Sequence, residues 1–226
     1  MAQQYFSIDP SHETKAPLDT SEVVFGVKTC KKFHQERTIF TLCYLLLQLK
    51  QACVRPVPVL RTTWATAQAG LRLLFYSDAE DTDVSTVVLP VEHVDRGFCS
   101  KTMGILRHAL TSQRTPAKWL VIADDDTLLS VNRLLQFLPC QDPTRPLALG
   151  QRYGYLAALD HGYNYPTGGA GMILSWPAVQ ALAAGCHCPE PDSPDDMVLG
   201  HCLRHLGIPL LHVPLMHQVG CSGTTD

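Results

Sequence analysis

Short apolar runs alternate with amphipathic stretches along this chain, a pattern typical of an α/β domain. An apolar run without internal alternation favours a strand that is covered on both faces, as in a largely parallel sheet. Runs of this kind lie at residues 23–27, 71–78, 86–90, 119–123, 146–150 and 208–213. Helices are predicted at residues 101–110, 131–138 and 178–184. The last of these follows Ser175, a favourable N-cap, and ends at Gly185.

The run at residues 119–123 stops at three consecutive aspartates, Asp124, Asp125 and Asp126. Such carboxylates cannot all stay ionised and close together without a cation to offset their charge. They follow the end of a strand at which open α/β sheets bind ligands. Asp124 and Asp126 form an Asp-x-Asp pair whose oxygens suit Mg²⁺ or Mn²⁺. We therefore predict a divalent cation that holds a diphosphate. The alternative is an ordinary helix start, where the helix dipole also favours acidic residues.

Residues 167–172 contain three glycines, Gly168, Gly169 and Gly171, beside which the backbone could pass close to a ligand. A turn with no ligand is the alternative. Residues 28–34 form a polar and partly basic loop, which is placed to meet nucleotide phosphates but could equally be a solvated surface loop.

A second acidic pair, Asp195 and Asp196, begins a predicted helix after Pro194. A carboxylate in this position is well placed to act as a general base, and its neighbour can raise its pKa. Ordinary N-capping is the alternative. His217 follows the last predicted strand and is a candidate metal ligand, although a lone histidine is more often structural.

Composition narrows the class of protein. The formal net charge of −3 gives no nucleic-acid footprint. Nine cysteines without a C-x-x-C pair favour disulfides in the secretory pathway over a zinc site, and an odd count leaves at least one thiol unpaired. Residues 1–10 have no signal-peptide pattern, so we expect a fragment without its targeting segment, in which residues 1–21 are a linker or the tail of a preceding region. The apolar stretch 39–49 is too short to span a bilayer and lacks the polar face of a surface helix.

Seven motifs occur in the order found in the fringe-like β-1,3-glycosyltransferases, glycosyltransferase family 31, which the chain resembles from about residue 22 to residue 218. They are Phe25–His34, Tyr76–Asp78, Cys99–Thr102, Trp119–Thr127, Thr167–Met172, Pro194–Gly200 and Pro214–Gln218. Within the family, the chain is most similar to the β-1,3-glucosyltransferases that extend O-linked fucose on thrombospondin type 1 repeats.

The resemblance implies a GT-A fold, an inverting mechanism, Mn²⁺ and UDP-glucose as the donor. The implied metal ligands are Asp126, Asp124 and His217. The implied donor contacts are Val27, Lys28, Thr29, Asp78, Lys101, Asp124, Asp125, Gly168, Gly169 and Gly171. The implied base is Asp196, with Asp195 as the less favoured choice. The implied partners are a UDP-sugar and O-fucosylated thrombospondin-repeat proteins, in the endoplasmic reticulum lumen or the Golgi. Members are lumenal or membrane-associated, and this chain has no predicted transmembrane helix.

The chain also departs from the family pattern. Residues 38–54 look inserted, and the family continues well beyond the last motif, so we expect residues 22–226 to form an incomplete GT-A catalytic domain. Two alternatives to glucose transfer therefore stay open. One is a fringe-type β-1,3-N-acetylglucosaminyltransferase, and the other is a truncated or misspliced chain without catalytic activity.

Overall fold

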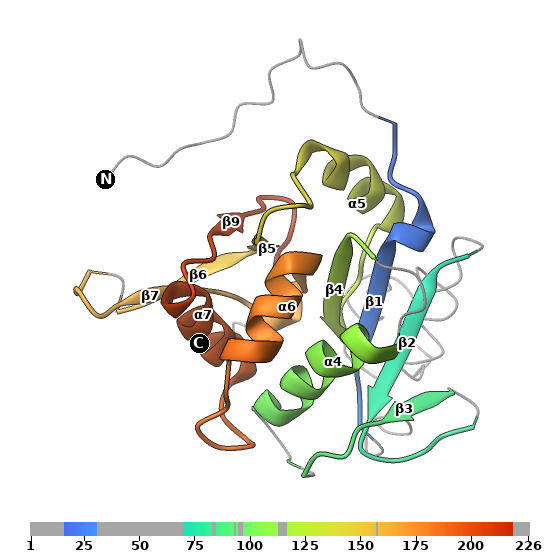
Figure 1. The fold of residues 1–226 in the computed structure, drawn as a ribbon, viewed down its shortest axis with the longest axis horizontal. Coiled ribbons are helices and arrows are strands. Elements are labelled where there is room, and N and C mark those ends of the chain that lie inside the picture. The colour runs from blue at the N-terminus through green and yellow to red at the C-terminus, as the bar shows by residue number, and fades with distance from the viewer. Residues whose placement is uncertain are drawn as a thin grey trace, which may run out of the picture.

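The computed structural model describes residues 16–30, 70–82, 85–92, 94, 97–112, 117–156 and 158–218. In that part of the chain, helices flank a seven-stranded sheet (Figure 1). The strand order is β3-β2-β1-β4-β8-β5-β9, with β8 antiparallel to its two neighbours and every other adjacent pair parallel. The predicted α/β class with a largely parallel sheet is therefore confirmed. None of the described helices is long and apolar enough to cross a membrane.

The sheet consists of β1 Val23–Lys28, β2 Arg72–Ser77, β3 Thr86–Val88, β4 Trp119–Asp124, β5 Ala148–Gly150, β8 Met172–Ser175 and β9 Leu210–His212. A separate antiparallel hairpin pairs β6 Arg152–Tyr155 with β7 Tyr163–Pro166. The α-helices are α4 Cys99–Ser112, α5 Val131–Phe137, α6 Trp176–Gly185 and α7 Asp195–His205. The described residues also form three short 3₁₀ helices, η1 Thr20–Glu22, η2 Leu138–Cys140 and η3 Gly168–Ala170.

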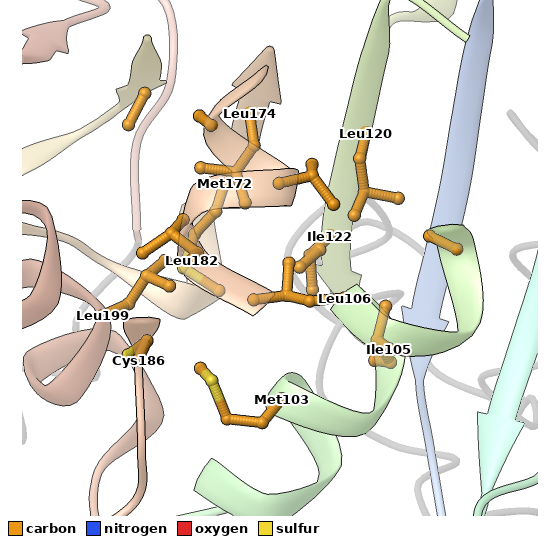
Figure 2. Packing of buried hydrophobic residues seen from close by; sticks show 14 of the residues in the cluster. Met103, Ile105, Leu106, Leu120, Ile122, Met172, Leu174, Leu182, Cys186 and Leu199 are labelled. Atoms are coloured by element: carbon orange, nitrogen blue, oxygen red, sulfur yellow. The ribbon is translucent and has the colours of Figure 1, made fainter. Parts of the chain in front are cut away.

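The central strands are covered on both faces, as their uninterrupted apolar runs predict. Along β4, Leu120 and Ile122 face a core layer formed with α4, α6 and α7, where Leu106 of α4 lies against them (Figure 2). Trp119 and Val121 face the opposite layer, to which α5 contributes Val131 and Leu135. Burying each large aliphatic side chain stabilises the fold by about 1.5–3 kcal/mol. These two layers hold β1 and β4 in the middle of the sheet and so fix where their ends lie.

Every predicted strand and helix corresponds to an observed element, with ends displaced by a few residues. The structure adds β8, which begins at Met172, the last residue of the glycine-rich motif, and ends at Ser175, which was predicted only as an N-cap. It also adds β6 and β7, which are rich in tyrosines, exposed in β6 and partly buried in β7, and so lack the aliphatic alternation that predicts a strand.

The prediction that Ser175 caps α6 is only half right. The helix does begin directly after Ser175, but the side chain makes no capping hydrogen bond. Its hydroxyl donates to the Arg145 carbonyl at 2.7 Å and accepts from the Leu147 N–H at 2.9 Å. Ser175 is the last residue of the buried strand β8, which lies next to the segment before β5. Its side chain therefore binds that segment rather than capping α6.

Three predictions lie outside the described residues: the tail up to residue 15, the basic positions 31–34 and the inserted stretch 38–54.

Candidate active site

The predicted site residues converge at one edge of the sheet because the strand register brings them there. Lys28, the last residue of β1, pairs with Tyr76 of β2 on one side and with Asp124 of β4 on the other. On the far side of β4, Ile122 pairs with Met172, the first residue of β8. The segments that leave β2, β1 and β4 therefore meet the glycine-rich segment that enters β8. This is the edge at which α/β sheets bind ligands.

Lys28 joins the end of β4 to the start of α7. Its Nζ lies 3.0 Å from Asp124 Oδ1 and 2.5 Å from Asp195 Oδ2, and the residue is only 5% exposed. Thr102 of α4 donates a second hydrogen bond to Asp195 Oδ2, at 2.6 Å. Burial by itself lowers the pKa of Lys28, but the charges of Asp124 and Asp195 outweigh burial and hold its pKa above the ordinary value. The ammonium group is therefore charged and bonded to two protein carboxylates.

The three consecutive aspartates have three different environments. Asp124 contacts Lys28 and is partly exposed, whereas Asp125 is buried and accepts a hydrogen bond from Thr29 Oγ1 at 2.8 Å. Asp126 is exposed to solvent. The protein's own Lys28 offsets part of the negative charge of this cluster, and the predicted divalent cation stays a prediction. Asp126 is thus the most exposed of the three carboxylates.

Lys101 lies within electrostatic range of both Asp125 and Asp78. This α4 side chain is buried, donates to the Thr29 carbonyl at 2.6 Å and lies 5.3 Å from the centre of the Phe98 ring. Burial lowers its pKa, while the nearby carboxylates of Asp78 and Asp125 oppose that shift. The predicted donor contacts at Thr29, Asp78, Lys101 and Asp125 are therefore close neighbours. Val27, also predicted, is buried one residue before Lys28 in β1.

The glycine-rich segment lies between the aspartates and the last motif. A Cβ added at Gly168 would lie 3.5 Å from Asp124 Oδ2, and one added at Gly169 would lie 3.0 Å from Gln218 Cδ. Thr127 fastens the segment by donating to the Gly169 carbonyl at 3.2 Å. Gly171 has a φ of +85°, which favours glycine. The backbone at these glycines therefore lies close to Asp124 and Gln218, and its approach to a ligand stays a prediction.

His217 lies in the segment that packs on these glycines. A Cβ added at Gly171 would lie 3.5 Å from Met216 Cε, so the residues on both sides of His217 contact the glycine-rich segment. The His217 side chain is exposed. Within the described residues, no group of three or more His, Cys, Asp or Glu side chains is arranged to hold a metal ion by itself. The assignment of Asp126, Asp124 and His217 as metal ligands stays a prediction.

Asp195 and Asp196 are adjacent in sequence but differ in environment. The Asp195 carboxylate is bonded to Lys28 and Thr102. Asp196 accepts hydrogen bonds from the N–H groups of Met197, at 2.7 Å, and Gly168. Burial and, to a lesser degree, the charge of Asp195 raise the pKa of Asp196, although these hydrogen bonds and Lys28 oppose the shift. Asp196 therefore faces the glycine-rich segment with a raised pKa.

Among the described residues, two disulfides fasten the segment between α6 and α7, one to the start of α4 and the other to α7. Cys99 is bonded to Cys188, and Cys186 to Cys202. The Asp195 N–H also donates to the Gly97 carbonyl at 2.9 Å. The predicted disulfides are thus present, although the sequence did not indicate how the cysteines pair. Cys140 is exposed and takes part in neither bond.

Two residues of the site carried no prediction of their own. Thr102 binds Asp195, and Gln218 packs on Gly169. Both residues lie inside motifs that carry the family resemblance. A polar residue at the second position of the predicted helix, directly after Lys101 in the same motif, was the available signal for Thr102.

Sequence comparisons relate the chain to known proteins over most of its length. The model of the Fringe-like family matches residues 53–220. The β-1,3-glucosyltransferase of Mus musculus is 43% identical over 203 residues, and that of Homo sapiens is 42% identical over 205 residues. These alignments cover 89% and 90% of this chain but only 37% of each relative. The β-1,3-N-acetylglucosaminyltransferase manic fringe of Danio rerio is 25% identical over 230 residues, covering 89% of this chain and 57% of that protein. The chain therefore belongs to the fringe-like glycosyltransferase family, and it is more similar to the two glucosyltransferases than to manic fringe.

Proposed function

We propose that this chain carries the donor site and the base of an inverting β-1,3-glucosyltransferase. Its reaction would move glucose from UDP-glucose to the 3-hydroxyl of O-linked fucose on thrombospondin type 1 repeats. One observation carries the proposal: Asp196, a carboxylate with a raised pKa, shares the sheet edge with the triple aspartate, through Lys28 and Gly168. The 42–43% identity to proteins named β-1,3-glucosyltransferase supports the choice of sugar.

The donor occupies the edge formed by the ends of β2, β1 and β4. Its uridine lies near Asp78, Thr29 and Lys101, which are close together and partly or fully buried. Its diphosphate lies by the exposed Asp126, and its glucose lies along Gly168 and its neighbours. Pre-formed contacts of this kind are expected of a nucleotide site, because the ligand then loses little affinity to reorganisation.

A divalent cation of the Mn²⁺ or Mg²⁺ type fits the chemistry of this edge. Such ions are usually held by one or two carboxylates together with the phosphates of the substrate, and Asp126 and Asp124 offer carboxylate oxygens next to the proposed diphosphate position. His217 would add a nitrogen ligand from the segment that packs on the glycines. When bound, the cation would act as a Lewis acid that offsets negative charge on the leaving UDP.

Asp196 would remove the proton of the acceptor hydroxyl. As the Asp196 carboxylate takes that proton, the hydroxyl oxygen forms a bond to C1 of glucose from the face opposite UDP. The bond between C1 and the β-phosphate oxygen breaks, and its electron pair leaves with UDP, so the configuration at C1 is inverted. A positioned general base contributes about 10²–10⁴-fold to such a rate. Asp195 suits this role less, because accepting the proton would weaken its bond to Lys28.

We also propose the lumen of the endoplasmic reticulum or the Golgi as the compartment, with O-fucosylated thrombospondin-repeat proteins as partners. The two disulfides support an oxidising compartment, since such bonds are rare in the cytosol.

Glucose transfer to a fucosylated thrombospondin-repeat peptide tests the reaction, with UDP-glucose and UDP-N-acetylglucosamine compared as donors. Faster transfer from UDP-glucose is expected, and a preference for UDP-N-acetylglucosamine would favour the fringe-type alternative. Thermal melting with UDP and Mn²⁺ tests the non-catalytic alternative separately. Ligand at 100 times its dissociation constant adds about 2.7 kcal/mol to stability. The proposal would be overturned if UDP and Mn²⁺ did not raise the melting temperature and the chain transferred no sugar.

A further inference from the structure

The β6–β7 hairpin carries four tyrosines on one face. Tyr153 lies directly opposite Tyr165, and Tyr155 lies directly opposite Tyr163. The ring centres are 6.0 Å apart in the first pair and 5.4 Å apart in the second. Because side chains alternate along a strand, residues two apart share a face, and the four rings form one aromatic surface.

Only half of this surface is covered by the rest of the described chain. Tyr165 packs on Gly200 of α7, where an added Cβ would lie 2.3 Å from the Tyr165 Cβ. The Tyr163 ring packs edge-on against His201, with 5.6 Å between ring centres. Tyr153 and Tyr155, in contrast, are 41% and 44% exposed. The β6 side of the aromatic surface therefore faces solvent.

The turn between the two strands extends the exposed surface with leucines. Leu156 and Leu159 are 44% and 50% exposed, and Leu156 has a φ of +48°, which is unusual for a branched side chain. Arg204 of α7 holds the turn in place by donating to the carbonyls of Gly162 and Asp160, at 2.7 and 2.6 Å. The hairpin patch, defined here as Tyr153, Tyr155, Leu156 and Leu159, is thus fastened to α7 while its apolar groups face outward.

The hairpin that carries this patch contacts α7 close to the proposed base, Asp196. Gly200, on which Tyr165 packs, is four residues after Asp196 and lies on the same face of α7. The hairpin also continues directly from Pro166 into Thr167 and Gly168, and the Gly168 N–H donates to Asp196. Figure 1 shows β7 beside α7 at the edge of the domain. A molecule whose hydroxyl reaches Asp196 from this side would lie over the hairpin.

We propose that the hairpin patch docks the protein part of the acceptor, namely the folded module whose O-linked sugar reaches Asp196. This inference rests on the proposed function. Exposed tyrosines offer large and rigid contact areas with a polar tip, and they are enriched among the residues that dominate protein interfaces. The exposed leucines favour a protein surface over a sugar, which would need a denser set of hydrogen-bonding groups.

The test separates recognition of the protein from recognition of the sugar. Tyr153→Ala and Tyr155→Ala are made singly and together in the full chain. Tyr155→Phe keeps the ring, and Val88→Ala is the matched control, because Val88 is 47% exposed on β3, at the far end of the sheet. Each variant is assayed for transfer to a fucosylated thrombospondin repeat, for transfer to a small aryl fucoside, for UDP-glucose hydrolysis without acceptor, and for binding of the repeat.

Each alanine variant should raise the KM for the repeat about tenfold, relative to the small fucoside and to hydrolysis. The phenylalanine variant should lose much less, and Val88→Ala should match the wild type. An unchanged KM for the repeat would overturn the proposal. Equal losses with the repeat and the fucoside would also overturn it, because the patch would then act on the sugar or the base. So would a variant that changes oligomeric state, because a second copy would then cover the patch.

Binding distinguishes this proposal from the proposed function. If the wild type binds the repeat and the double alanine variant does not, but neither transfers glucose, the proposed reaction fails while the docking surface stands. If wild type and variant bind the repeat equally, the docking surface fails whatever the reaction is.

Discussion

Replacing Lys28 with methionine tests whether the buried ion pair holds the active-site edge together. The side chain is 5% exposed and bonds to both Asp124 and Asp195, which lie at the ends of different elements. Lys28→Met keeps most of the volume but leaves the buried Asp195 carboxylate with only the Thr102 hydroxyl on its Oδ2. Breaking a buried pair on one side costs about 3–5 kcal/mol, because the remaining charge stays desolvated. The contact with Asp124 adds little, because that carboxylate is 29% exposed and screened by solvent.

The assay is thermal and urea denaturation of four proteins: wild type, Lys28→Met, Asp195→Asn and the double variant. A loss of 3–5 kcal/mol lowers the melting temperature of a domain of this size by roughly 6–20 °C. The double variant should be less destabilised than the sum of the two single variants, because it leaves no unpaired charge at this position. The expected coupling is about 1–3 kcal/mol.

Lys118→Met is the matched control, because Lys118 pairs with Glu22 but is 47% exposed. An exposed pair is worth about 1 kcal/mol or less, so the control should melt close to the wild type. The reasoning is refuted if Lys28→Met and Lys118→Met lose the same stability, or if the effects of Lys28→Met and Asp195→Asn simply add.

Three further predictions concern the base, the metal and the disulfides. Asp196→Asn should slow transfer about 10²–10⁴-fold, and it should also remove the acid limb of the wild-type pH–rate profile, whose midpoint lies above the ordinary aspartate pKa of 3.8. The same variant should be at least as stable as the wild type at pH 7. Folding favours the neutral Asp196 carboxyl, so its stabilising effect is present at low pH and is lost as pH rises through the raised pKa. Asp126→Ala should abolish the Mn²⁺-dependent rise in melting temperature with UDP, measured by calorimetry. Replacing Cys99 and Cys188 together by alanine should cost about 2–5 kcal/mol in urea unfolding, since the bond closes a loop of 89 residues.

Each of these has an outcome that contradicts it. An acid limb that survives in Asp196→Asn would assign the base elsewhere, with Asp195→Asn as the comparison. A full Mn²⁺ response in Asp126→Ala would remove Asp126 from the metal site. Unchanged unfolding of the double cysteine variant, with Cys140→Ala as the control for an exposed thiol, would mean that the bond adds nothing to stability.

The sequence predicted the parts of the fold that local patterning controls. The run at Trp119–Asp124 was recognisable because a strand covered on both faces needs unbroken apolar residues. Because the three aspartates follow the carboxyl end of this strand, they could be placed at the edge where α/β sheets bind ligands without knowing which strands lie beside it. The start of α7 at Asp195 was equally local, because proline followed by acidic residues favours a helix start.

What the sequence could not predict depends on contacts between distant residues. Lys28 was expected to bind the donor, and nothing near it in sequence indicates that its amine meets Asp195, 167 residues away. The pairing of Cys186 with Cys202 is equally undetermined by spacing, because nine cysteines allow many pairings. The hairpin of β6 and β7 was missed because it packs on α7 through tyrosines rather than through an apolar stripe.

The bond between Lys28 and Asp195 has a consequence for synthesis of the protein. A nascent chain makes β1 and then Asp124 well before Asp195, the more buried of the two carboxylates that bond to Lys28. Until Asp195 is made, burying the ammonium group is less favourable, so β1 should stay accessible to chaperones for longer. A ribosome that stalls before Asp195 should therefore release a product in which β1 is less firmly docked.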